Sequence, residues 1–74
     1  MMRFAVVYEK AQNNWAAYIP DLPGCISTGR TLAETKLNIR EAFELHLEAM
    51  KEVGEPLPEP SADVGFVELE PIAS

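Results

Sequence analysis

The sequence contains one cysteine and one histidine among its 74 residues. A single cysteine cannot form an internal disulfide, and no second thiol or histidine pair stands at zinc spacing, so neither kind of cross-link is expected to stabilise the fold. A chain this short builds only a thin core, and small domains without cross-links usually need a partner subunit. We therefore predict a single domain, residues 1–74, that assembles into a dimer or a larger homo-oligomer.

Basic side chains and long hydrophobic runs are also scarce. Six Lys and Arg residues stand against twelve Asp and Glu residues, which gives a formal net charge of -6. A field of this sign repels phosphate, so we expect no direct binding to nucleic acid. It suits a basic protein partner, although acidic surfaces also keep small proteins soluble. No segment approaches the ~20 apolar residues of a membrane span or follows a signal-peptide pattern, and we expect a cytoplasmic protein without membrane contact.

The chain opens with two segments in which apolar residues alternate. Residues 3–9 are rich in β-branched and aromatic side chains, the polar "KAQNN" follows, and the alternation resumes over residues 15–19. This pattern predicts two strands joined by a hairpin loop. Trp15 and Tyr18 point to opposite faces of the second strand. One belongs to the core and the other is the better candidate for a partner contact, for which we choose Tyr18, because aromatic residues carry much of the energy in interfaces.

A stiff corner, "IPDLPGCISTG", follows at residues 19–29. Pro23 fixes its own φ and Gly24 can adopt the positive φ of a type II turn, so we predict such a turn leading into a third short strand. Cys25 is more typical of a small buried hydrophobic residue than of a reactive thiol. Two interpretations of the corner stay open: it sets the angle between two strands, or it presents Asp21 and Leu22 to a partner at little entropic cost.

A helix is predicted from "TLAE" at residues 31–34 to just before Gly54. Thr31 and Glu34 match a capping box, in which the threonine hydroxyl accepts from the glutamate amide and the glutamate carboxylate reaches back. Apolar residues then recur at intervals of three and four along one stripe. Leu37 and Leu45 lie off this stripe, and we predict that they contact a second copy of the chain.

The last part of the chain combines a spacer with a predicted fourth strand. "EPLPEPSAD" is rich in proline, which predicts an extended and stiff connection. Residues 64–70, "VGFVELE", alternate again and predict an edge strand whose Val67 and Leu69 contribute to the oligomer interface. A right-handed crossover would place this strand parallel to the first one, in the spatial order 3-2-1-4. We therefore predict an α+β fold (β-β-β-α-β): a small antiparallel three-stranded meander, one long helix on one face, and a fourth edge strand.

The order of these elements resembles the HicB-like antitoxin family. The resemblance spans about residues 3–60 and depends most on "PDLPGC" followed by "GRTLAE", then on "NIREAFELHLE" and "GEPLPEP". It implies a degraded ribonuclease H-like fold that self-associates and that binds and blocks a HicA-like toxin, a small basic RNA-cleaving protein. Members of the family commonly continue into a DNA-binding segment. These 74 residues contain none, so the resemblance here implies a stand-alone domain without operator binding.

A ribonuclease H-like topology also raises the question of catalysis. Two-metal phosphodiester chemistry needs several converging carboxylates. The candidates are dispersed: Glu9 ends the first strand, Asp21 lies in the corner and Glu34 caps the helix, while His46 has no nucleophile or carboxylate placed beside it. We predict a non-enzymatic binding module of the antitoxin type, without metal or cofactor. The alternative is a stand-alone self-associating domain that binds a small ligand or acts as a scaffold.

Overall fold

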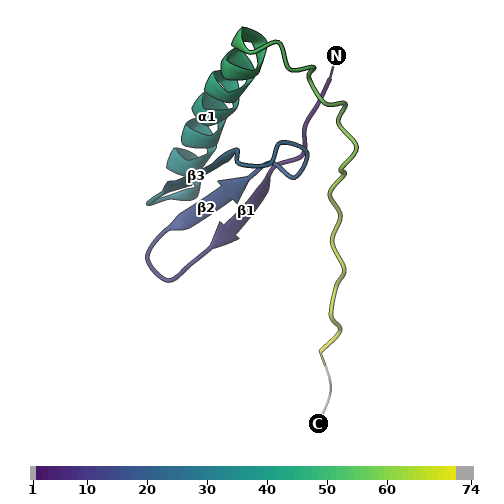
Figure 1. Cartoon of the computed structure of the whole chain (residues 1–74). Coiled ribbons are helices and arrows are strands. Elements are labelled where there is room, and N and C mark those ends of the chain that lie inside the picture. The colour runs from purple at the N-terminus through teal and green to yellow at the C-terminus, as the bar shows by residue number, and fades with distance from the viewer. Residues whose placement is uncertain (1, 72–74) are drawn as a thin grey trace.

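The computed structural model describes residues 2–71 and contains three strands followed by one helix (Figure 1). The strands are β1 (Val7–Lys10), β2 (Trp15–Tyr18) and β3 (Ile26–Gly29), and the helix is α1 (Leu32–Glu52). They form an antiparallel sheet in the order β1-β2-β3, and α1 packs against β2 and β3. The predicted α+β class, the meander and the single long helix are confirmed.

The register of the sheet separates its two faces. Tyr8 lies opposite Ala17, and Ala17 is buried in the core beneath α1. Neighbouring residues in a strand point to opposite faces. The adjacent row, in which Val7 pairs with Tyr18 and Tyr18 pairs with Ile26, therefore lies on the face that α1 does not cover.

The core combines residues of the sheet, the corner and the helix. Its buried hydrophobic members are Ala17, Ile19, Leu22, Cys25 and Ile39, and Phe4, Val6, Tyr8, Ala42, Phe43, Leu47 and Met50 pack against them. The rings of Phe4 and Phe43 lie 5.6 Å apart between centroids, at an interplanar angle of 56°. The predicted burial of Cys25 is confirmed, and desolvation raises the pKa of its thiol.

The corner consists of two successive turns. Leu22 N donates to Ile19 O at 3.0 Å, and Cys25 N donates to Leu22 O at 3.0 Å. Gly24 adopts a φ of 89°, in the region that glycine enters at little cost. This hydrogen bond and this φ confirm the predicted turn over residues 22–25. Ile19 N also donates to Cys25 O at 3.2 Å, which closes the corner at its base.

Both ends of α1 lie where the sequence predicts them. Thr31 Oγ1 accepts from Glu34 N at 3.1 Å. The Glu34 carboxylate reaches back to Arg30 N at 3.0 Å, one residue beyond the position that a standard capping box would use. At the other end Gly54 has a φ of 75°, and Glu55 N donates to Met50 O at 2.9 Å, which is a glycine-terminated helix cap.

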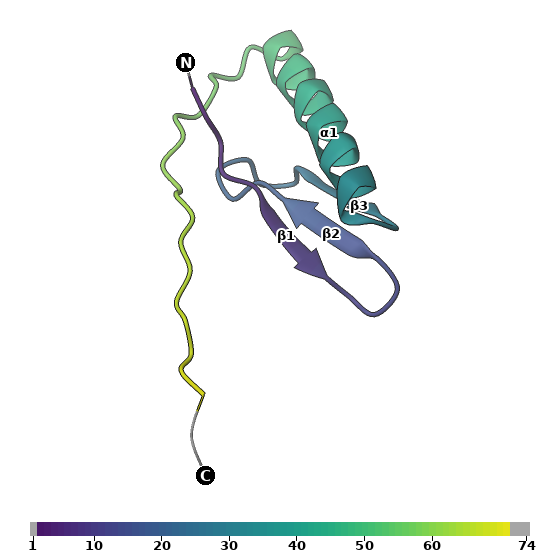
Figure 2. The same ribbon diagram turned by 180° about the vertical axis from the view of Figure 1, so that it is seen from behind.

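The predicted fourth strand is absent from the described chain. Residues 64–70 are extended but pair with no other strand, and Val67 and Leu69 are 100% and 90% exposed. The segment runs away from the sheet, as the yellow-green part of the ribbon shows from both sides (Figures 1 and 2). The spatial order 3-2-1-4 and the completed ribonuclease H-like topology are therefore not confirmed, and the described residues form only the order β1-β2-β3. Alternation shows that a segment can pair, whereas pairing needs a neighbouring edge that the chain actually reaches.

Candidate partner-binding surfaces

The first candidate surface is the helix-free face of the sheet. Tyr18 lies at its centre, between Val7 of β1 and Ile26 of β3, with 37% of Tyr18 and 68% of Ile26 exposed. Trp15 points to the other face and is half-buried. The structure thus places Tyr18 on the open face, in an apolar row that the sequence alone did not assemble. Its binding role stays a prediction.

Asp21 forms a contact that sequence reasoning missed. Its Oδ2 accepts from Ser61 N and from Ala62 N, both at 2.9 Å, and its Oδ1 accepts from the Ser61 hydroxyl at 2.8 Å. Ser61 is 40 residues away in sequence, so no local pattern could have indicated the pair. The carboxylate therefore holds the proline-rich connection against the corner.

The same hydrogen bonds control the protonation of Asp21. The Ala62 amide, the Ser61 amide and the Ser61 hydroxyl, in this order, lower the pKa of the carboxyl below its ordinary value, because each favours the ionised form. Because the pKa of Asp21 is lower in the folded state than in the unfolded state, the contact contributes fully to the stability of the fold above about pH 4. The contribution is lost as the pH falls through the lowered pKa.

This linkage gives a prediction for solution NMR. Asp21→Ala should move the Ser61 and Ala62 amide resonances to positions typical of a free chain, and the wild-type resonances should move the same way only below about pH 4. Asp63→Ala is the matched control, since Asp63 Oδ1 accepts from the neighbouring Val64 N at 2.8 Å, a contact within the connection itself. Unchanged Ser61 and Ala62 resonances in Asp21→Ala would contradict the hydrogen bonds of the Asp21 carboxylate to the connection.

Leu22 is not a surface residue. It is 1% exposed and belongs to the core. The prediction that Leu22 contacts a partner directly is therefore wrong, because a side chain enclosed on all sides offers a partner no area. Within the corner, Pro23 and Gly24 are exposed, whereas Leu22 points inward.

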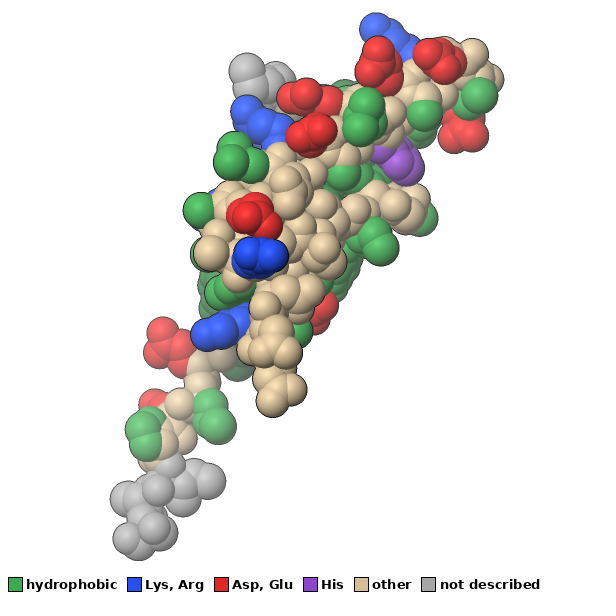
Figure 3. Space-filling view, turned by 90° about the vertical axis from the view of Figure 1, so that its left-hand side faces the viewer, with side chains coloured by type: hydrophobic (Ala, Val, Ile, Leu, Met, Phe, Trp, Pro, Cys, Tyr) green, Lys and Arg blue, Asp and Glu red, His purple; other side chains and the backbone are tan. Residues whose placement is uncertain are grey.

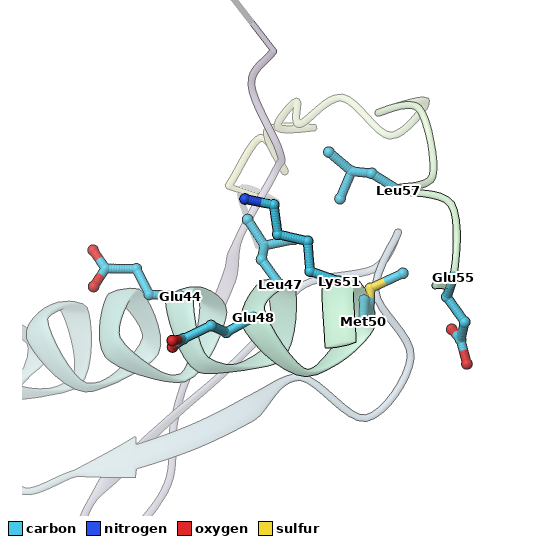
Figure 4. A pocket seen from close by; sticks show the side chains of 7 residues that line it. All are labelled: Glu44, Leu47, Glu48, Met50, Lys51, Glu55 and Leu57. Carbon is cyan, nitrogen blue, oxygen red and sulfur yellow. The ribbon is translucent and has the colours of Figure 1, made fainter. Parts of the chain in front are cut away.

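An acidic cleft at the end of α1 is the second candidate surface. It is an open cavity of about 470 Å³ between the helix and the following connection (Figure 4). Leu47, Met50 and Leu57 give it an apolar lining, and the carboxylates of Glu44, Glu48 and Glu55 surround it beside Lys51. Acidic side chains also gather over this end of the molecule in the space-filling view (Figure 3). Leu47 and Met50 also pack against the core. The sequence did not indicate the cleft, because Leu57 joins it only through the chain reversal at Gly54.

The sequence singled out two leucines of α1, of which Leu45 borders a shallow hollow beside Ser27 of β3. Leu37 is 71% exposed and Leu45 is 59% exposed. They lie on the same helix, and the structure brings neither into the core. Their predicted role in an oligomer interface, like that of Val67 and Leu69, stays a prediction.

The acidic residues that were weighed as nuclease ligands lie apart from one another, and two of them make structural hydrogen bonds. Glu9 is exposed at the end of β1, Asp21 holds the connection, and Glu34 caps α1. Across residues 2–71, the side chains of His, Cys, Asp and Glu form no group of three or more that could hold a metal ion. Over the same range, α1 is too polar for a helix that spans a membrane.

Taken together, the described residues form a thin α+β layer with an open apolar sheet face and an acidic cleft. The sequence profile of the HicB-like antitoxin of bacterial toxin–antitoxin systems matches residues 4–69. The chain belongs to this family.

Relatives occur in phage, archaea and bacteria. A 14.9 kDa protein from the rep-hol intergenic region of Haemophilus phage HP1 is 42% identical over 57 residues, which cover 77% of this chain and 43% of the phage protein. This chain thus spans less than half of the phage protein's length. A UPF0150 protein of Thermoplasma acidophilum is 32% identical over 63 residues, covering 84% of this chain and 91% of that protein.

One similarity is to a protein of known structure. A chain of the solved HicA3 and HicB3 toxin–antitoxin complex superposes with a TM-score of 0.69 at 37% sequence identity, over 81% of this chain and 70% of that chain. At this identity the likeness extends beyond the fold to the family that the sequence profile identifies.

Proposed function

We propose that this chain binds and blocks a small basic RNA-cleaving toxin of the HicA type and performs no chemistry of its own. The observation that carries the proposal is the similarity to a chain of the HicA3 and HicB3 complex, at 37% identity over 81% of this chain. The net charge of -6 supports it, because an acidic protein attracts a basic partner.

The toxin contacts the open sheet face, with Tyr18 at the centre of the contact. An exposed tyrosine flanked by Val7 and Ile26 combines apolar area with a hydroxyl at its rim, which is the composition of energetically dominant interface positions. Asp21 shapes the neighbouring corner through its hydrogen bonds to Ser61 and Ala62. The carboxylates around the cleft at the end of α1 attract the basic partner from a distance and raise the association rate more than the final affinity.

The test is a calorimetric titration of a catalytically inactive HicA-like toxin into this chain. We expect binding in the wild type, and we expect Tyr18→Ala combined with Ile26→Ala to raise the Kd at least about thirtyfold, as loss of a central interface contact does. Leu37→Ala is the matched control, an exposed apolar residue of α1.

Two results would contradict the proposal in different ways. Absence of binding by the wild-type chain would contradict the antitoxin function itself. Binding by the wild type that the Tyr18 and Ile26 variant retains unchanged would contradict only the placement of the toxin on the open face. Melting curves of each variant separate lost contact from lost folding.

A further inference from the structure

The segment from residue 64 to residue 70 has the properties of a strand without a sheet. Phe66, Val67 and Leu69 are 95%, 100% and 90% exposed. Figure 3 shows hydrophobic and acidic side chains next to each other on the part of the chain that leads to the C-terminus. Three large apolar side chains this exposed on one short segment indicate a surface that is covered in the assembled protein.

The sheet has a free edge that fits such a segment. In the order β1-β2-β3, the outer side of β1 has no neighbouring strand within the described chain. The opposite edge is partly covered, because Thr28 O in β3 accepts from Asn38 Nδ2 of α1 at 2.8 Å. An unpaired strand edge is a template for the addition of a further strand.

A cleft beside β1 has the complementary chemistry. It is an open cavity of about 400 Å³, and Phe4, Val6, Tyr8 and Phe43 supply much of its apolar lining. Three of the six basic side chains of the protein, Arg3, Lys36 and Arg40, surround it. Residues 64–70 bring two carboxylates, Glu68 and Glu70, and no basic residue. The apolar side chains of the segment thus match the apolar lining of the cleft, and the net charge of the segment is opposite to that of the basic side chains around the cleft.

We propose that residues 64–70 of one copy add to the free edge of β1 in a second copy, and that the exchange is reciprocal. Val67 and Leu69, which share one face of an extended segment, enter the cleft, and Glu68 and Glu70 alternate to the opposite face of the segment. A second copy is the occupant because the chain's own tail approaches β1 only at residues 60–64, where it lines a groove with residues 3–8, and then runs away from the sheet. A reciprocal exchange covers both tails and both edges in one twofold dimer.

Sedimentation equilibrium of the protein alone tests the exchange. The wild type should be a dimer, and Val67→Asp combined with Leu69→Asp should raise the dissociation constant at least about thirtyfold by placing charge in the apolar contact. Val53→Asp is the control, because Val53 is 71% exposed at the end of α1 and outside the proposed contact. A monomeric wild type, or a dimer that the double variant does not weaken, would overturn the proposal.

Cross-linking decides which copy receives the tail. A Glu9→Cys protein and a size-tagged Val67→Cys protein are mixed and treated with a short bis-maleimide; Cys25 is buried and stays unreactive. A product joining the tagged and untagged chains supports the exchange. A second experiment uses one chain that carries both Glu9→Cys and Val67→Cys. If this chain forms only intramolecular cross-links, at low and at high protein concentration, the proposal is overturned. Toxin plays no part in either experiment, so their outcome is independent of the proposed function.

Discussion

Leu22→Ala should lower the free energy of unfolding by about 2 to 5 kcal/mol, the usual loss when a fully buried leucine is truncated. Leu22 is 1% exposed and stands between the two turns of the corner, where the backbone is held by hydrogen bonds at 3.0 Å on either side. The surroundings cannot collapse easily into the vacated volume, so a cavity remains. A chain of this length has only about 4 to 11 kcal/mol of stability in total, at about 0.05 to 0.15 kcal/mol per residue. Urea denaturation measures the loss.

Leu37→Ala is the matched control for Leu22→Ala. Leu37 is 71% exposed, and its truncation should change the stability by less than about 0.5 kcal/mol. Both variants are measured at the lowest workable protein concentration, since Leu37 is a predicted oligomer contact. If Leu22→Ala proved as mild as Leu37→Ala, the corner would be a surface loop after all, and Leu22 would return as a partner contact.

Gly29→Ala should be similarly damaging, with a loss of about 2 to 3 kcal/mol from overpacking. A Cβ at this position would lie 2.5 Å from Thr35 Oγ1, 2.8 Å from Thr35 N and 3.0 Å from Thr35 Cα. The last two are backbone atoms of the first turn of α1, so the helix itself would have to move away from β3. Thr35 is fully buried and its hydroxyl donates to Thr31 O at 2.7 Å, which leaves little freedom to adjust.

Gly65→Ala provides the comparison for Gly29→Ala. Nothing lies within 4 Å of a Cβ at Gly65, so this variant should stay within about 0.5 kcal/mol of the wild type. Combining Gly29→Ala with Thr35→Ala removes the contact with the hydroxyl but not those with the backbone, and it should not restore stability. A neutral Gly29→Ala would show that α1 does not approach β3 as closely as the structure has it.

The sequence by itself determined the features that depend on neighbours a few residues apart. The hydroxyl of Thr31 and the amide of Glu34 are three residues apart, the turn at Gly24 is closed between Leu22 and Cys25, and the helix ends at Gly54. In each case the residue type restricts the backbone or supplies the capping group directly. Strand alternation likewise placed Trp15 and Tyr18 on opposite faces.

Only the tertiary structure decided the features that join distant parts of the chain. The Asp21 carboxylate meets Ser61, 40 residues away. Leu22 turns inward because β2, the corner and α1 close around it, although its neighbours Asp21 and Pro23 are not buried. The segment at residues 64–70 has the pattern of a strand but finds no edge in its own chain. Periodicity indicates which face of a segment is apolar. Which residues cover this face depends on how the folded chain brings distant segments together, and no local pattern encodes that arrangement.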